Sequence, residues 1–387
     1  MVTYTSAGPT FTPKHRWSTK NNALCGICLF ALLELIWRYR QHVDWRRYWQ
    51  RVVFLTLVAT FNSCLGLVEM VLYSKAVAKQ PVHPRPIFIL GHPRTGTTLL
   101  HNLLSLDDEF GFCSTFCAGF PSSFLWFERF QWMLAGMVDD TRPMDNMPLS
   151  LDVPQEDELA VNVLTAGTSP YAPLTFMTAE PSFRPFFSFR EAPQAATRRW
   201  IDAFLHVLRK LSYRANGRRL LLKSPAHTGR VELLLKLFPD AQFVYIHREP
   251  EAVYLSACHM ADTQYWFMYL KQPTDEQVHE FILNQFEVLW HEYEVARELI
   301  PKGNLVEVAY SELSAQPVQT IGRIYSTLGL PGWDRMRPKV ETSVNLPSAK
   351  RYQKNVFDPL PPSLRQKVAA RWAKYSEAWG YRWSKED

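Results

Sequence analysis

The chain has 387 residues, of which 47% are hydrophobic and 21% are charged, and this balance excludes a wholly disordered protein. The formal net charge of +6 is too small to indicate a nucleic-acid partner, and none is expected, but it suits a small polyanionic ligand or an anionic membrane surface. Six cysteines are too few for a disulfide-stabilised scaffold. Cys25 and Cys28 lie in an apolar run, which favours small buried side chains over a metal site.

Two apolar stretches open the chain, at residues 23–37 and 52–73, and a basic, aromatic stretch separates them. The first is short for a bilayer span, which needs about 20 residues, and the second is long enough but contains Asn62 and Glu69. Three arrangements are open: the stretches span a bilayer, lie in its interface, or pack as buried helices on the rest of the chain. The basic and aromatic residues between them favour a membrane-associating helical segment over residues 1–80, on the cytosolic face or an endomembrane.

After a proline-rich linker at residues 76–85, short apolar runs alternate with helical patterns. The apolar runs predict buried strands at residues 86–90, 219–223, 241–247 and 304–310. Helical spacing of apolar residues predicts helices at residues 97–106, 197–211, 228–238, 249–260 and 317–330. Because strands that alternate with helices form parallel sheets, we expect an α/β fold of the P-loop-like three-layer α/β/α type, with a central parallel sheet and the N-terminal apolar helices in front of it.

The sequence ILGHPRTGTTLL follows the first predicted strand and contains Gly91 and Gly96. Glycines at a strand end let backbone N–H groups turn toward an anion, and the dipole of the following helix adds to the attraction. Nucleoside triphosphatases carry a lysine at the position of Thr97, so the motif argues against Mg²⁺-dependent hydrolysis of ATP or GTP. The basic residue, Arg94, lies inside the loop instead. The predicted anion-binding residues are His92, Pro93, Arg94, Thr95, Gly96, Thr97 and Thr98.

A second motif, HREPEAVYLSA, places Arg248 at the end of a predicted strand and Ser256 on the helix that follows. A guanidinium at the carboxyl edge of a parallel sheet and a hydroxyl on the adjacent helix can hold a second phosphate. By itself this motif is weak, because an arginine at a strand end usually meets solvent or a carboxylate. Together with the Gly91 loop it predicts a site for an anion with two separate phosphates.

Three segments carry a family resemblance: PIFILGHPRTGTTLLHNLLSLD, LLLKSPAHTGRVELLLKLFPDAQFVYIHREP, and the C-terminal pair KRYQKN and RWAKYSEAWGY. They resemble the sulfotransferase superfamily, in the branch that is similar to protein-tyrosine sulfotransferases and to membrane-associated bacterial and algal members. The resemblance covers roughly residues 60–383. It implies transfer of a sulfuryl group from 3′-phosphoadenosine 5′-phosphosulfate (PAPS) to an acceptor, without a metal, leaving 3′,5′-adenosine bisphosphate (PAP). Residues 81–387 would form the catalytic domain.

The resemblance also implies roles for individual residues. The loop at residues 92–98 would hold the 5′-phosphosulfate, with Arg94 touching the bridging and sulfuryl oxygens. Arg248 and Ser256 would hold the 3′-phosphate, and Lys223 would stabilise the transition state. A basic loop near the C-terminus would close over the nucleotide with Lys350, Arg351 and Lys354.

Transfer to a hydroxyl also needs a base, for which the sequence offers several residues. Glu156, Asp157 and Glu158 enter a predicted helix side by side, and carboxylates in a partly dry groove can have raised pKa values. Glu156 and Glu158 are the first choices. His227 competes with them, and His101 is a weaker third. The alternative for the three acids is an acidic helix start stabilised by the helix dipole.

The aromatic, proline-rich stretch at residues 110–189 is expected to supply helices and loops over the site. Its apolar character favours a small or lipophilic alcohol as acceptor over a long polyanionic glycan, unless these aromatic residues are simply core. Two other functions stay open. A P-loop nucleotide kinase or phosphotransferase would need Mg²⁺, and a membrane-tethered nucleotide-binding protein without enzymatic activity would keep the phosphate clamp but tolerate loss of Lys223.

Overall fold

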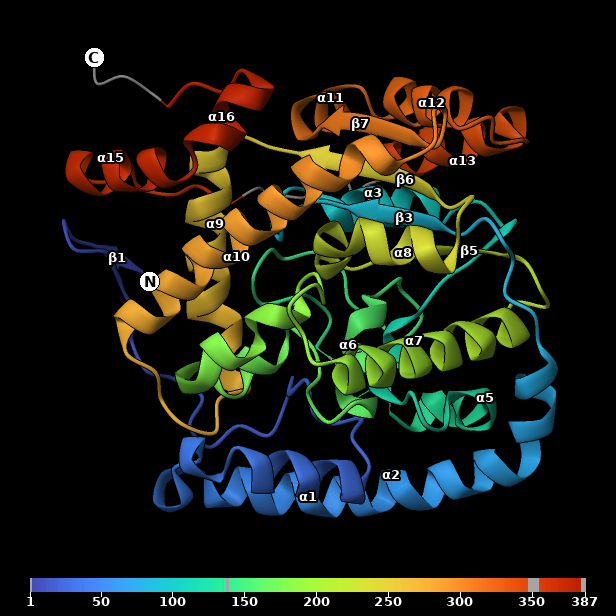
Figure 1. Cartoon of the computed structure of the whole chain (residues 1–387), viewed down its shortest axis with the longest axis vertical. Coiled ribbons are helices and arrows are strands. Elements are labelled where there is room, and N and C mark those ends of the chain that lie inside the picture. The colour runs from blue at the N-terminus through green and yellow to red at the C-terminus, as the bar shows by residue number, and fades with distance from the viewer. Residues whose placement is uncertain (1, 135, 137–138, 347–354, 384–387) are drawn as a thin grey trace.

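The computed structural model describes residues 2–134, 136, 139–346 and 355–383. Five parallel strands form a central sheet in the order β4-β5-β3-β6-β7 (Figure 1). Their bounds are β3 Ile87–Leu90, β4 Phe110–Gly111, β5 Arg219–Lys223, β6 Gln242–His247 and β7 Leu305–Ala309. The four predicted strands are confirmed, as is the α/β fold class. The fifth strand, β4, has two residues, which is too short to leave an apolar run in the sequence.

β3 lies in the middle of the sheet and pairs with β5 on one side and β6 on the other. Ile89 pairs with Lys223 of β5, and Leu90 pairs with Tyr245 of β6, so the carboxyl ends of three strands meet at one edge. After β3 the chain adds β4 and β5 on one side of this strand, and then β6 and β7 on the other, which makes this edge a topological switch point. Ligands of open α/β sheets bind at such points.

Helices cover both faces of the sheet (Figure 1). Ile87 and Ile89 pack on one face with α3, α12 and α13, whereas Phe88 and Leu90 pack on the other with α7, α8, α9 and α10. The helix bounds are α3 Thr97–Leu104, α7 Gln194–Arg214, α8 Val231–Leu237, α9 Pro250–Gln264, α10 Asp275–Ala296, α12 Pro317–Thr327 and α13 Trp333–Asn345. The predicted helices are thus present, but the one expected at 228–238 begins as a 3₁₀ turn, η6, and its α-helical part is shorter.

The remaining segments connect and cover these layers. The region 110–189 contains short helices and loops, as expected. The further bounds are β1 Thr3–Tyr4, β2 Pro9–Thr10, α1 Leu29–Arg38, α2 Trp45–Lys79, α4 Thr115–Gly119, α5 Phe124–Phe127, α6 Asp157–Leu164, α11 Tyr310–Ala315, α15 Pro362–Arg371 and α16 Ala373–Trp379. The 3₁₀ segments used below are η2 Glu128–Met133, η5 Met177–Phe186, η6 Pro225–Arg230 and η8 Arg297–Leu299.

The two N-terminal helices, α1 and α2, lie side by side along the edge of the molecule away from the sheet (Figure 1). One face of each helix shares a small core with η5 and neighbouring residues, to which Leu32, Leu55 and Phe183 contribute. α2 is long and apolar enough to cross a membrane by length and composition. Its polar residues Asn62 and Glu69 are buried, and since both helices contribute to the shared core, each packs on the body through one face. The division at residue 80 stays a prediction.

Candidate functional site

The loop between β3 and α3 depends on two glycines. Gly91 has φ of +142° and Gly96 has φ of +100°, a region that side chains other than glycine rarely adopt. A Cβ atom on Gly91 would lie 2.6 Å from the carbonyl oxygen of Ile246, and one on Gly96 would lie 2.4 Å from the ring of Tyr310. The loop is therefore packed closely against β6 and the residue after β7, and its backbone turns at the start of α3.

The two sequence motifs meet at this loop. Arg94 donates a hydrogen bond from Nε to Oγ of Ser256 at 3.0 Å, across 162 residues of sequence. Arg248 donates from Nη1 to the carbonyl oxygen of Arg94 at 3.1 Å, and its guanidinium lies 4.4 Å from the centre of the Tyr310 ring. The structure therefore brings Arg94, Arg248 and Ser256 into one cluster at the carboxyl edge of β3 and β6.

A carboxylate that the sequence analysis did not single out also enters this cluster. Asp145 is buried and pairs with Arg94 at 2.9 Å between Oδ2 and Nη1. Arg142 comes with it, lying 3.6 Å from Asp145 and donating to Oγ1 of Thr98 at 3.2 Å. The signal in the sequence is only the charged run DDTRPMD inside an aromatic region, and it does not reveal which loop that run will contact.

Lys223 lies at the end of β5 with its ammonium group buried beside α3 and α6. Its Nζ atom is 2.8 Å from Oε1 of Glu156 and 3.5 Å from Oγ1 of Thr98. Burial lowers the pKa of Lys223, and the charge of Glu156 opposes this shift. Glu156 accepts a second hydrogen bond, at 2.5 Å, from the hydroxyl of Tyr171, a partner that the sequence did not indicate. The Glu156 side chain is 19% exposed, so it is reachable from solvent while Lys223 is not.

Glu158 has a different environment, and the geometry does not support it as the base. Its two oxygens bind Arg230 at 2.5 and 2.9 Å, and both side chains are fully buried. Ser169 and the indole N–H of Trp200 also donate to this carboxylate. Every direction from which a substrate would approach is therefore filled by protein, and the prediction of Glu158 as a base is corrected: the side chain stabilises the core around α6.

The two histidines proposed as bases are also enclosed. Nε2 of His227 lies 2.6 Å from Oδ2 of Asp157, and both side chains are fully buried. The His227 ring packs against aromatic side chains on two sides, so it does not face the loop. Burial, and next the charge of Lys223, lowers the pKa of His101 to about 3, which makes it a weak base. Of the four residues proposed as bases, Glu156 alone lies at the cluster and is accessible.

The other predicted loop residues hold the loop together. Burial lowers the pKa of His92 to about 3, so its ring is neutral, and it lies 2.6 Å from the carbonyl oxygen of Pro93. Thr95 is buried and donates to the carbonyl oxygen of His92 at 2.7 Å. Thr97 and Thr98 form the first turn of α3, with Thr98 facing Lys223 and Arg142. The C-terminal basic residues Lys350, Arg351 and Lys354 lie outside the described residues.

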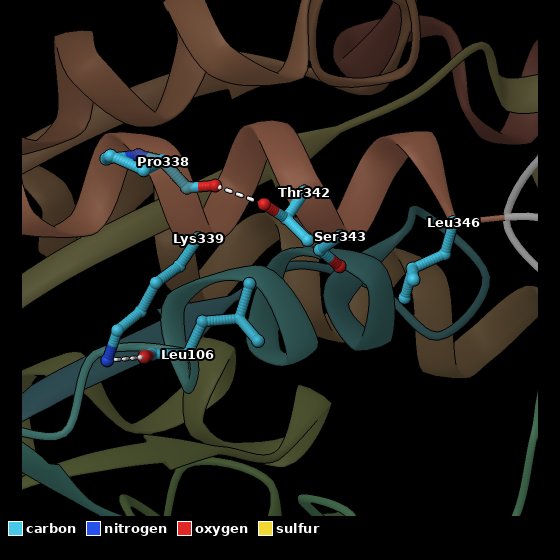
Figure 2. Close-up of a pocket in the computed structure, with 6 residues that line it drawn as sticks. All are labelled: Leu106, Pro338, Lys339, Thr342, Ser343 and Leu346. Carbon is cyan, nitrogen blue, oxygen red and sulfur yellow. Dashed lines mark hydrogen bonds between the residues drawn. The ribbon is translucent and has the colours of Figure 1, made fainter.

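One further hollow gives no competing site among the described residues, and neither do groups of metal ligands. Figure 2 shows a surface hollow between the end of α3 and α13, lined by Leu106, Pro338, Lys339, Thr342, Ser343 and Leu346. Its lysine donates to the carbonyl oxygen of Leu106 at 3.1 Å and pairs with Asp108, so the hollow lacks converging reactive groups. In the part of the chain that the structure describes, no three His, Cys, Asp or Glu side chains come together as metal ligands.

Comparison with known proteins finds relatives with a similar sequence. A family model described as the sulfotransferase family matches residues 86–335. The omega-hydroxy-beta-dihydromenaquinone-9 sulfotransferase Stf3 of Mycobacterium bovis is 31% identical over 367 residues, which is 95% of this chain and 93% of that protein. The protein of the same name from Mycobacterium tuberculosis gives the same values.

Solved structures show the same fold at lower identity. Sulfotransferase STF1 of M. tuberculosis has a TM-score of 0.62 and 18% identity, with coverage of 89% of this chain and 90% of that one. Sulfotransferase STF9 of Mycobacterium avium has a TM-score of 0.63 and 19% identity, with coverage of 87% of both chains. The likeness of fold therefore extends over 89% and 87% of this chain in the two comparisons.

Proposed function

This chain belongs to the sulfotransferase family and is an enzyme of sulfuryl transfer, and we propose that its donor is PAPS and its acceptor the hydroxyl of a lipophilic molecule. One observation carries the choice of donor. Arg94, Arg248 and Lys223 converge on the loop after β3, together with the start of α3. PAPS carries anionic groups at two separate positions of one nucleotide, and a site with several cations and a helix N-terminus suits such a ligand.

In this proposal the 5′-phosphosulfate lies against the loop and the start of α3, and the 3′-phosphate lies at Arg248 and Ser256. Because Arg94 touches Ser256 and is itself contacted by Arg248, one guanidinium links the two positions. Before the donor binds, Asp145 occupies Arg94, so the donor must take over that contact.

The proposed transfer is an in-line displacement at sulfur. The acceptor oxygen forms a bond to sulfur while the bond between sulfur and the 5′-phosphate oxygen breaks, and PAP leaves with that electron pair. The negative charge that spreads over the sulfuryl oxygens, as in phosphoryl transfer, is stabilised by Arg94 and Lys223. The acceptor proton moves to Glu156, which is the accessible carboxylate beside Lys223. Tyr171 donates to Glu156 and holds it in place.

The acceptor class rests on the relatives rather than on a cavity. The M. bovis relative is named for an omega-hydroxylated dihydromenaquinone, which is a lipid with a terminal hydroxyl. Several aromatic residues of the 110–189 stretch belong to the core, including Phe116, Phe124 and Phe183, so this stretch adds less support than its composition promised. A kinase is disfavoured, because Thr97 stands where a P-loop lysine would.

The test uses the full chain in mild detergent with sulfur-labelled PAPS and a panel of isoprenoid, quinone, sterol and phenolic alcohols. We expect PAP to bind in calorimetry and label to pass to an isoprenoid or quinone alcohol without added divalent metal. Arg94→Ala should lower kcat by about 10²–10³-fold, as for loss of one preorganised donor to a transition-state oxyanion. Arg335→Ala, on the exposed side of α13, is the matched control. Failure to bind PAP would overturn the proposed donor, and transfer only to polar sugars would overturn the proposed acceptor.

A further inference from the structure

The outward face of α2 carries large apolar side chains that nothing in the described structure covers. They recur at helical spacing, so that Trp49, Val53, Leu57, Phe61, Val68 and Val71 lie along one side of the helix. Leu57 is 67% exposed and Val71 is 78% exposed. From residue 52 to residue 74 the only charged residue of α2 is Glu69, and Glu69 is buried. Single exposed apolar residues are ordinary, whereas a continuous stripe of this length marks an interaction surface.

The neighbouring segments extend this surface. α1 packs beside α2 and exposes Phe30 and Trp37, the latter at 72%. On the other side, η2 exposes Trp132 at 71%, and Arg129 of η2 donates to the hydroxyl of Tyr73 on α2. We call the exposed apolar side chains of α1, α2 and η2 the apolar face. The helices α1 and α2, which carry most of this face, lie at the edge of the molecule farthest from the sheet (Figure 1).

The opposite side of α2 is fixed to the body along its length. Near its start, Arg51 donates to the carbonyl oxygen of Tyr269 at 2.5 Å. In its middle, the indole N–H of Trp126 on α5 donates to the carbonyl oxygen of Leu65, and Asn62 donates to the carbonyl oxygens of Cys25 and Ile27 in the segment before α1. Near its end, Glu69 is buried in an ion pair with Lys210 of α7.

A helix fixed at three points cannot leave the body to cross a bilayer without breaking buried polar contacts.

The charges at the two ends of the apolar face identify its partner. Arg38, Arg40 and Arg46 are exposed where α1 ends and α2 begins, and Lys75 and Lys79 are exposed where α2 ends. Tryptophan side chains lie among the basic residues, with Trp37 4.8 Å from the guanidinium of Arg40. An apolar face bordered by tryptophan and basic residues is typical of helices that lie in the interface of an anionic bilayer.

We propose that the apolar face lies in the interface of an anionic bilayer with α2 parallel to the membrane plane, so that the protein is bound to one leaflet and does not span it. The basic ends of α2 contact lipid phosphates, while side chains such as Leu57 and Val71 enter the outer part of the acyl layer. This inference is independent of the donor and acceptor proposed above.

The first test is flotation of the full chain with vesicles of phosphatidylcholine alone or mixed with phosphatidylglycerol. We expect binding to the mixed vesicles and weaker binding in high salt. The double variant Leu57→Glu with Val71→Glu should bind the mixed vesicles at least about tenfold more weakly than the unchanged chain. Leu299→Glu, which changes a 55% exposed leucine in η8, is the matched control and should bind like the unchanged chain. Circular dichroism checks that all variants fold.

Failure of the unchanged chain to float, or equal loss of binding in the control, would overturn the proposal. So would a dimer in sedimentation that Leu57→Glu dissociates while no vesicle binding is seen, because the apolar face would then meet a second copy.

Depth in the bilayer gives a second, independent test. Cys64 is exposed in the middle of α2, so a thiol-reactive fluorophore can be placed there. An in-plane helix predicts stronger quenching by nitroxides near the headgroups than by nitroxides near the bilayer centre. The reverse order would mean a spanning helix and would overturn the proposal.

Discussion

The loop after β3 and the start of α6 each contain several polar residues next to one another in the sequence. The loop residues meet at one place, whereas the acids of α6 have separate partners. In the loop, neighbouring residues contribute to one site. Arg94 binds Ser256 there, while the hydrogen bond from Thr95 to His92 holds the loop backbone in place. In α6, consecutive acids have separate partners. Glu156 meets Lys223, Asp157 meets His227, and Glu158 meets Arg230.

The difference follows from backbone geometry. Asp157 and Glu158 point about 100° apart as successive residues of a helix, and Glu156 precedes the helix with an extended backbone, so the three acids do not face one site. A loop that turns over its own strand end can direct backbone groups and a side chain inward together. A run of like residues therefore indicates a site much more reliably in a loop than at the start of a helix.

Glu156→Gln should have the largest effect on catalysis. Glutamine keeps the size of the side chain but cannot accept a proton, so we expect kcat to fall by about 10²–10⁴-fold, with PAP affinity changed only a few fold. Steady-state kinetics and calorimetry measure the two quantities. Glu341→Gln, in an exposed pair with Arg337, is the matched control. Unchanged kcat in Glu156→Gln would mean that the first turn of α6 does not take part in the reaction.

Glu158→Gln should act on stability instead. It leaves the buried guanidinium of Arg230 without its counter-charge, and we expect the free energy of unfolding to fall by about 3–5 kcal/mol. Glu341→Gln should change it by about 1 kcal/mol or less. Denaturant unfolding measures both, and kcat per folded molecule should stay close to that of the unchanged enzyme. A large loss of kcat in folded Glu158→Gln would contradict the separation of the two carboxylates.

Lys223, the partner of Glu156, should make both stability and activity depend on pH. Its pKa is lowered by burial below the ordinary value of 10.5, so the folded chain releases this proton at a lower pH than the unfolded chain does. Between the two pKa values the unfolded state binds more protons than the folded state. The contribution of Lys223 to the free energy of unfolding therefore rises with pH through that window, because the buried charge is lost. Activity moves the other way, because neutral Lys223 cannot stabilise the sulfuryl oxygens.

We therefore expect kcat/KM to fall on the alkaline side with an apparent pKa below 10.5. Lys223→Arg keeps the charge at high pH and should move that limb upward, whatever its effect on the maximum rate. A pH–rate profile of both enzymes measures this. An alkaline limb at the same pH in both would assign it to another group.

Asp145→Asn should have the smallest effect, and it should strengthen binding. The amide keeps the shape but removes the charge that competes for Arg94, so we expect PAP to bind roughly fivefold more tightly, about 1 kcal/mol. Calorimetry measures this against Asp108→Asn, whose carboxylate pairs with Lys339 near the surface hollow of Figure 2. Weaker binding in Asp145→Asn would show that the carboxylate supports the site instead.

The sequence predicted the features whose signals are local. The strands β3, β5 and β6 are rich in apolar residues because both of their faces are covered, and the loop glycines are required by the close approach of Ile246 and Tyr310. That the two motifs would lie near each other followed from the rule that parallel strands end at one edge of the sheet, whereas the direct contact of Arg94 with Ser256 was not predicted.

The sequence could not predict contacts made by segments that wrap around the body. Asp145 lies 51 residues from Arg94, and Tyr171 lies 15 residues from Glu156 with a turn between them, and no periodicity links either pair. Glu158 was chosen wrongly because its partner, Arg230, is 72 residues away and no pattern in the sequence joins them. Apolar residues lie on all sides of α2, and the sequence does not show that Asn62 and Glu69 would find partners on the body, so it left open whether the helix spans, lies on, or avoids a membrane.

The ion pair between Asp145 and Arg94 has a consequence for which anions the enzyme accepts. A ligand does not fill a bare positive site but exchanges with an anion that the protein already carries. A small ion with one charge gains little from that exchange, because it replaces one carboxylate with another single charge. In the proposed site, a ligand with charges at two places can contact Arg94 and Arg248 together, whereas a small ion reaches only one of them, so we expect the site to favour anions with charges at two places.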